Sequence, residues 1–125
     1  MLSHLKTRVL IIGLAFASVV ACALPAAANC SGARYKFNFV GETVDATPMQ
    51  VSPGACNVTS YSGGSITSSE IVVKPSHGSA SAARAGFVYV PKQGYHGSDS
   101  LQWKACGSSK HGSGCSMVNF TFDVQ

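Results

Sequence analysis

Three side chains that could together carry acyl-transfer chemistry lie within four residues of one another, in the stretch QGYHGSDSLQW from Gln93 to Trp103. His96 has the chemistry of a general base, Ser98 that of a nucleophile and Asp99 that of an orienting carboxylate. The stretch leads into an alternating strand pattern, however, and neighbours on a strand point to opposite faces, so Ser98 and Asp99 diverge. A GxSxG nucleophile elbow is also absent from the sequence. We therefore predict no catalytic residue here and interpret the stretch as a turn between strands.

Histidines and methionines offer the alternative of a copper site. His77, His96 and His111 supply imidazoles, and Met49 or Met117 supplies a thioether; both ligand types suit copper. Each histidine falls in a turn-like stretch, and their spacing matches no ligand motif. Calcium would need about six to eight oxygen ligands, whereas the chain offers five scattered carboxylates. We predict neither a metal nor another cofactor.

Cysteine usage indicates an oxidising compartment. Beyond residue 28 the chain carries four cysteines, Cys30, Cys56, Cys106 and Cys115, an even number that favours two disulfides. Four cysteines allow three connectivities. We favour Cys30 with Cys56 and Cys106 with Cys115, because CGSSKHGSGC reads as a glycine- and serine-rich loop between two strands. A zinc site is the competing interpretation, but the sequence contains no CxxC pair.

The first 28 residues have the pattern of a secretory signal peptide. Lys6 and Arg8 form a basic start, Val9 to Ala23 is apolar, and small residues precede a cleavage site after Ala28. The apolar run is shorter than the roughly 20 residues that span a bilayer. We predict that residues 1–28 are removed and that residues 29–125 form a single exported domain, secreted or periplasmic.

A second interpretation of the leader remains open. Val19, Val20, Ala21 and Cys22 resemble a bacterial lipobox, in which Cys22 would carry a lipid anchor. We expect cleavage after Ala28 in preference to this anchor.

Charge argues against a nucleic-acid partner. The predicted mature domain holds seven Lys and Arg against five Asp and Glu, a formal net charge of +2, and the +4 of the whole chain includes Lys6 and Arg8. Nucleic-acid binders show a patch or stripe of basic residues on one face. Here the basic residues are spread singly along the sequence and form no stripe.

Hydrophobic periodicity predicts an all-β domain. In RYKFNFV, Tyr35, Phe37 and Phe39 share one face, the mark of a half-buried strand. A turn at 84–86 separates two segments that we expect to pair as a hairpin. No segment has a helical period, so we predict a single antiparallel β-sandwich of about seven strands. The seven predicted strands are 34–40, 49–51, 71–74, 79–82, 87–90, 98–105 and 117–124.

The stretch KPSHGSASAARAGFVYVPKQGYHGSDSLQWKA resembles the bacterial Ig-like, cadherin-like domains. The run that carries the likeness covers about a third of the predicted mature chain and contains Pro75, His77, Gly78, Phe87, Tyr89, Pro91, Gly94, Tyr95, Gly97, Asp99, Ser100 and Trp103. The resemblance implies an Ig-like sandwich in which Gly94, Tyr95, Gly97 and Asp99 form a structural corner. In that corner the Asp99 carboxylate would accept hydrogen bonds from backbone donors in the turn. The acidic linker motifs of calcium-binding relatives are absent.

Three functions are compatible with these observations. The first is a non-catalytic exported module that contacts an unknown protein or envelope component. The second is a small periplasmic copper-binding protein or enzyme that uses the histidines. The third is an inhibitor or carbohydrate-binding module that uses the loops at one end of the sandwich. We expect the first.

Overall fold

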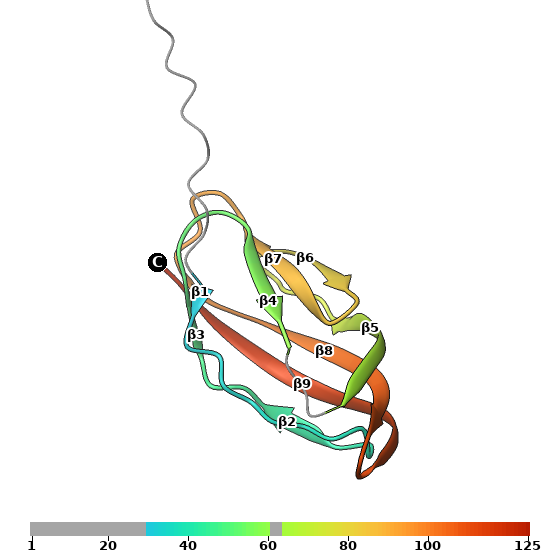
Figure 1. Ribbon diagram of the computed structural model, residues 1–125. Coiled ribbons are helices and arrows are strands. Elements are labelled where there is room, and N and C mark those ends of the chain that lie inside the picture. The colour runs from blue at the N-terminus through green and yellow to red at the C-terminus, as the bar shows by residue number, and fades with distance from the viewer. Residues whose placement is uncertain (1–29, 61–63) are drawn as a thin grey trace, which may run out of the picture.

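The computed structural model describes residues 30–60 and 64–125, and these residues form two β-sheets and no helix. The predicted signal peptide, 1–28, and the alternative anchor residue, Cys22, lie outside the described residues. Figure 1 shows the two sheets as layers that share one core. The strands are β1 (Cys30–Ser31), β2 (Thr43–Asp45), β3 (Met49–Val51), β4 (Cys56–Thr59), β5 (Ser65–Val73), β6 (Gly78–Ala83), β7 (Gly86–Pro91), β8 (Gly97–Ser109) and β9 (Gly112–Val124).

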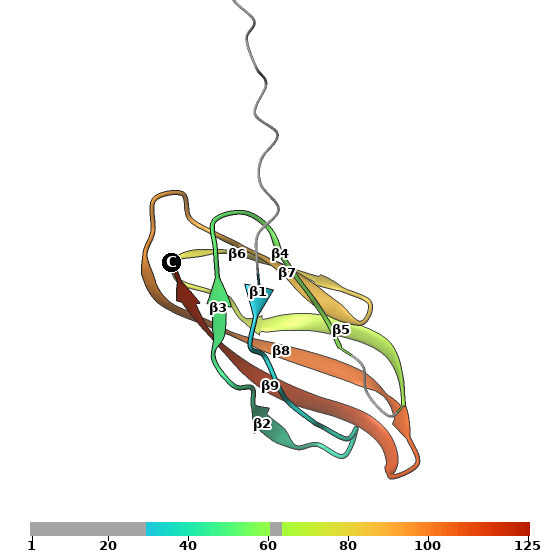
Figure 2. The ribbon, with the colours of Figure 1, turned by 60° about the vertical axis from the view of Figure 1, so that its left-hand side comes forward.

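The larger sheet has six strands and is built around the β8–β9 hairpin. Its order is β1-β3-β9-β8-β5, and β2 also pairs with β9. The smaller sheet has the order β4-β7-β6. Figure 2 shows the two long strands, β8 and β9, side by side beneath the smaller sheet. The described residues thus confirm the all-β prediction and the two-layer arrangement.

The prediction of a purely antiparallel fold was wrong in part. β2 and β3 both pair with β9 in parallel, through the rungs Thr43↔Met117 and Met49↔Phe122 among others. Each of these strands has only three residues, too few for a period that would show its neighbour or its direction. The described residues therefore form nine strands, where periodicity predicts seven.

Segment 34–40 was predicted to be a strand and is not one. It is assigned to no sheet, although its side chains alternate as expected, with Phe37 and Phe39 buried and Lys36 exposed. Phe37 packs edge-on against Trp103 of β8 with ring centroids 6.0 Å apart, and Tyr35 packs against Phe120 of β9 at 5.1 Å. The segment therefore completes the core layer beside the smaller sheet.

The other predicted strands agree with the structure except at their ends. Segments 49–51, 79–82, 87–90, 98–105 and 117–124 all lie within β3, β6, β7, β8 and β9, and β6 pairs with β7 as the predicted hairpin. β5 is longer than the predicted 71–74, because the serine- and threonine-rich residues from Ser65 onward also pair with β8. Lys74 lies just outside it. Register shifts near Thr67 and Val72 explain why this strand lacks a clean alternating pattern.

The core is aromatic, as the alternation in β7, β8 and β9 predicts. Tyr89 stacks on Phe122 with ring centroids 4.1 Å apart and planes at 5°. Phe87 meets Phe120 edge-on at 4.8 Å, an arrangement that aromatic pairs prefer. These four side chains and Trp103 are at most 1% exposed. The two sheets are therefore joined mainly through aromatic rings from three strands.

Both open sides of the sandwich are closed by contacts between the sheets. On one side the Cys30–Cys56 disulfide joins β1 of the larger sheet to β4 of the smaller one. On the other, the hydroxyl of Ser69 in β5 donates to the carbonyl oxygens of Ala83 and Gly86 in the β6–β7 hairpin. The sheets are held together at their edges as well as through the core.

Candidate functional site

The Asp99 carboxylate is the centre of a hydrogen-bonded corner at the start of β8. Its side chain is 6% exposed. Oδ1 accepts the backbone N–H groups of Ser76 at 3.0 Å and Ser100 at 2.9 Å. Oδ2 accepts the backbone N–H of His77 at 3.1 Å and the hydroxyl of Tyr89 at 2.6 Å. A buried carboxylate with four donors is a satisfied structural group.

The corner ties together three segments that are distant in the sequence. Asp99 lies on β8, Tyr89 on β7, and Ser76 and His77 in the connection between β5 and β6. Lys92 then donates its backbone N–H to the carbonyl of His77 at 2.8 Å. The predicted acceptor was in place, but most of its donors come from outside the turn in which the sequence placed them.

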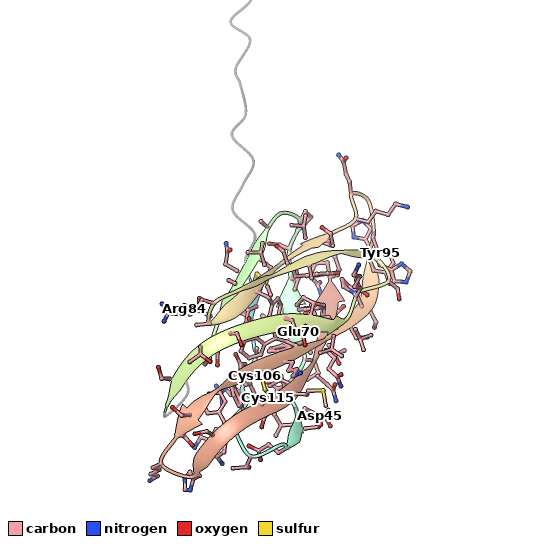
Figure 3. The ribbon with its side chains drawn as sticks, turned by 90° about the vertical axis from the view of Figure 1, so that its right-hand side faces the viewer. Asp45, Glu70, Arg84, Tyr95, Cys106 and Cys115 are labelled. Carbon is pink, nitrogen blue, oxygen red and sulfur yellow. A yellow bond between two sulfur atoms is a disulfide. The ribbon has the colours of Figure 1, made fainter. Side chains whose placement is uncertain are left out.

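Two glycines give the chain the path that this corner requires. Gly94 has φ +81° and Gly97 has φ +134°, conformations that residues with a Cβ rarely adopt. Between them, Tyr95 donates its N–H to the carbonyl of Lys92 at 3.0 Å, and its hydroxyl donates to the carbonyl of Ser98. Figure 3 shows Tyr95 at the end of the molecule where these connections meet.

Burial of Tyr89 shifts its acid–base equilibrium. Its pKa is raised above the ordinary value of 10.0, first by burial and then by the hydrogen bond to Asp99 and the charge of that carboxylate. Burial also raises the pKa of Tyr35, and a hydrogen bond from Ser60 lowers it by a smaller amount. Both phenols therefore stay protonated in the folded protein to higher pH than in the unfolded chain.

The structure does not assemble His96, Ser98 and Asp99 into a triad. Asp99 points into the core and is engaged by its four donors, whereas Ser98 and His96 are exposed. The Ser98 backbone carbonyl, and not its hydroxyl, takes part in the corner. Opposite orientation of neighbours on a strand separates the serine from the carboxylate, as the sequence predicts.

Sequence reasoning missed two participants in the corner. Tyr89 and His77 belong to the family-like run but were not named among the corner residues. For Tyr89 the available signal was that a buried tyrosine hydroxyl usually needs a partner. His77 stacks on Tyr95 with ring centroids 4.1 Å apart and planes at 2°. No local pattern pairs these residues, since they lie 18 positions apart and meet only when the two connections fold together.

The three histidines of the copper hypothesis are not brought together. His96 lies just before β8 and His111 in the turn after it, so the 13 residues of β8 separate them. At about 3.3 Å per residue this is roughly 40 Å. Within residues 30–60 and 64–125, no group of three His, Cys, Asp or Glu side chains is placed to share a metal ion.

Both predicted disulfides are confirmed. Cys30 is joined to Cys56 between the sheets, and Cys106 to Cys115 across neighbouring strands of the β8–β9 hairpin. The loop predicted between Cys106 and Cys115 is smaller than expected, because both strands continue past the cysteines to a turn at Lys110 and His111. Two disulfides indicate an oxidising, extracytoplasmic environment.

The outer faces of the two sheets differ in charge. In the smaller sheet, the sequences CNVT, GSASAA and GFVYVP contain no Asp, Glu, Lys, Arg or His. The outer face of the larger sheet carries the Lys104–Glu70 ion pair at 3.4 Å. It also carries a hydrogen-bonded chain in which Asn119 donates to Asp45 and accepts from Gln102.

The uncharged face of the smaller sheet is made of small side chains. Its outward positions alternate with the buried Val58, Phe87 and Tyr89. We call this surface the neutral face; its outward residues are Asn57, Thr59, Ser79, Ser81, Ala83, Val88 and Val90. Val90 is 38% exposed, which is high for a large apolar side chain.

Comparison with known proteins gives no further guide to the site, since no family model, curated protein or solved structure matches this chain. No helix in the part of the chain that the structure describes is long and apolar enough to cross a membrane.

Proposed function

We propose that this chain is an exported bacterial Ig-like module without catalytic activity, which binds another protein of the cell envelope or extracellular space. The observation that carries the proposal is the state of Asp99. The one cluster in the sequence with the composition of a triad has its carboxylate engaged by four donors within the fold.

The same corner supports the Ig-like assignment. Four residues of the family-like run, His77, Tyr89, Tyr95 and Asp99, meet there although they span 23 positions of the sequence. A motif whose members converge on one structural feature is better explained by a fold requirement than by chance. This support comes from the contacts within the chain and does not depend on similarity to another protein.

Export and two disulfide cross-links fit a module that must stay folded outside the cell. A domain of about 97 residues buries a limited core, and each disulfide adds about 2–4 kcal/mol of stability. The two disulfides place the domain in an oxidising compartment, and the sequence pattern of residues 1–28 supplies a route there.

The neutral face is the surface we assign to the partner. Depletion of charged residues marks the centre of protein interfaces, and the strands of the smaller sheet carry none. The face also lacks exposed aromatic rings, since Phe87 and Tyr89 point inward. We therefore expect the partner to be a protein whose contact surface carries little charge.

Affinity capture with matched variants tests this function. The exported, oxidised protein is immobilised and exposed to envelope and culture-medium fractions of its source cells, beside Ser81→Lys on the neutral face and Ser100→Lys on the larger sheet. Both serines are exposed. We expect one partner to be retained by the wild type and Ser100→Lys and lost by Ser81→Lys.

Two results would contradict the proposal. Retention of the same partner by Ser81→Lys but not by Ser100→Lys would move the interface to the larger sheet. A hydrolytic activity that copurifies with the wild type and disappears in Ser98→Ala would show an enzyme.

A further inference from the structure

The two disulfides lie in different surroundings. Cys56 is 0% exposed and its bridge to Cys30 lies between the sheets. Cys106 and Cys115 are only half-buried and lie on the outer face of the larger sheet. The neighbouring Ala105 is buried on the opposite, inner face. Figure 3 shows the second bridge on that face, between β8 and β9. In the first bridge only Cys30 is half-buried, whereas both cysteines of the second bridge are, so the second is the more open to an attacking group from solvent.

The β8–β9 ladder does not depend on the Cys106–Cys115 bridge for most of its length. From Ala105↔Ser116 to Gly97↔Val124, nine rungs lie on the side of the bridge that faces the core. They include the buried pairs Trp103↔Val118 and Leu101↔Phe120. Opening the bridge therefore leaves the packed part of the hairpin in place.

Residues 107–114, which we call the hairpin tip, are held by backbone pairing: three rungs join the two strands of the tip, and Gly107 and Ser108 also pair with β5. None of the eight is buried, and three of them are glycines. The tip approaches its neighbours mainly through backbone: a Cβ at Gly107 would lie 2.0 Å from the carbonyl oxygen of Ser65, and one at Gly114 2.9 Å from that of Phe39, while one at Gly112 would lie 3.7 Å from the Val40 side chain. No side chain of the tip is buried, so backbone pairing and the disulfide at its base hold it in place.

The charge next to the bridge does not repel a thiolate. Lys104 lies two residues from Cys106 on the same face, and its rung partner is Met117, which is uncharged. Glu70 pairs with this cation at 3.4 Å, so the two charges largely cancel. A surface of little net charge leaves the approach of the anionic nucleophile in thiol–disulfide exchange unopposed.

From these features we propose that Cys106–Cys115 is a thiol–disulfide exchange site that opens while the sandwich and Cys30–Cys56 stay intact. The co-reactant is a dithiol reductant, either a small dithiol or a dithiol protein. Its thiolate attacks one sulfur of the bridge, forms a mixed disulfide and displaces the other cysteine as a thiolate, which takes up a proton. The second thiol of the reductant, as its thiolate, then displaces the remaining cysteine. Two electrons pass to the protein, giving two cysteine thiols, and the reductant becomes a disulfide.

The consequence of exchange is a change confined to one end of the molecule. The hairpin tip loses its covalent clamp and keeps only its backbone pairing, while Trp103 and the aromatic core keep their packing. Lys110 lies in the turn of the tip, and trypsin cleaves after lysine. Its cleavage therefore reports on release of the tip, and Trp103 fluorescence reports on the core.

Graded reduction of the whole oxidised protein tests the proposal. The protein is equilibrated with increasing dithiothreitol, free thiols are alkylated, and peptides are mapped by mass. We expect Cys106 and Cys115 to be alkylated at a dithiothreitol concentration at least about tenfold below that needed for Cys30 and Cys56, as exposure dictates. Tryptic cleavage after Lys110 should accelerate over the same range, with Trp103 fluorescence unchanged.

The variant Cys106→Ser/Cys115→Ser provides the matched control. Cleavage after Lys110 should be fast in it without reductant, and its Cys30–Cys56 bridge should open at the wild-type concentration. Simultaneous opening of both bridges, prior opening of Cys30–Cys56, or a fluorescence change that accompanies alkylation of Cys106 would each overturn the proposal. None of these outcomes bears on the partner expected at the neutral face, so the two proposals fail independently.

Discussion

At the scale of single residues, the hydrogen bond between Tyr89 and Asp99 makes stability depend on pH. Burial raises the pKa of Tyr89 in the folded state, and the Asp99 carboxylate 2.6 Å away raises it further, because ionising Tyr89 would place a second negative oxygen against it. The unfolded chain loses this proton near pH 10, while the folded protein keeps it. The stabilisation is thus complete below pH 10 and is lost as the pH rises toward the folded-state value.

We therefore predict that the free energy of unfolding falls steadily above pH 10. Urea denaturation between pH 8 and pH 11.5 measures this slope, and Tyr89→Phe should make it shallower because the group that titrates is gone. Tyr35 contributes in the same direction, so part of the slope remains. A slope equal in the wild type and Tyr89→Phe would disprove the assignment to Tyr89.

Local chemistry predicted the acceptor at the corner but not its donors. Asp and Gly between strands are typical of turns; Gly94 lies in the turn before β8, whereas Gly97 and Asp99 lie on β8 itself. The donors from Ser76 and His77 lie 23 and 22 residues away. Such contacts depend on how two connections fold against each other, which no local pattern encodes.

At the scale of strands and their links, the two disulfides should contribute unequally. Cys30–Cys56 closes 26 residues and Cys106–Cys115 closes nine. Loss of chain entropy in the unfolded state then gives about 3–4 kcal/mol for the first and about 2–3 kcal/mol for the second. The first also joins edge strands of different sheets, whereas the second joins strands already paired.

We predict that Cys30→Ser/Cys56→Ser lowers the urea midpoint more than Cys106→Ser/Cys115→Ser does. Equilibrium denaturation of the two double variants under non-reducing conditions makes the comparison. A larger loss from the Cys106 and Cys115 pair would show that the hairpin tip carries more of the stability than its exposure implies.

Periodicity correctly predicted which faces of the strands are buried. It was a poorer guide to which strands are neighbours. In 34–40 the alternation correctly placed Phe37 and Phe39 inside, but a burial pattern does not show whether a ladder partner exists. The backbone of Arg34 instead bonds to Thr47, through N–H to Oγ1 at 2.8 Å and O to N–H at 3.1 Å. For β2 and β3 the parallel direction follows from where the chain returns to β9, which three residues cannot reveal.

At the scale of the whole molecule, charge separates the two sheets. The strands of the smaller sheet are uncharged, and the larger sheet carries Asp45, Glu70 and Lys104 on its outer face. The net charge of the sequence is small, and the even spread of its basic residues argued against a basic stripe. The contrast between faces needed the register of the strands, because it depends on which alternate residues point outward.

The central claim is that the Asp99 carboxylate is a structural acceptor of four hydrogen bonds. The decisive measurement is the free energy of unfolding, by urea denaturation, of Asp99→Ala, Ser98→Ala and His96→Ala beside the wild type. Loss of the buried acceptor should cost Asp99→Ala about 2–4 kcal/mol, since four donors lose their partner. The two exposed changes should each stay within about 0.5 kcal/mol. A stability of Asp99→Ala equal to that of the other two variants would contradict the structural role of this carboxylate.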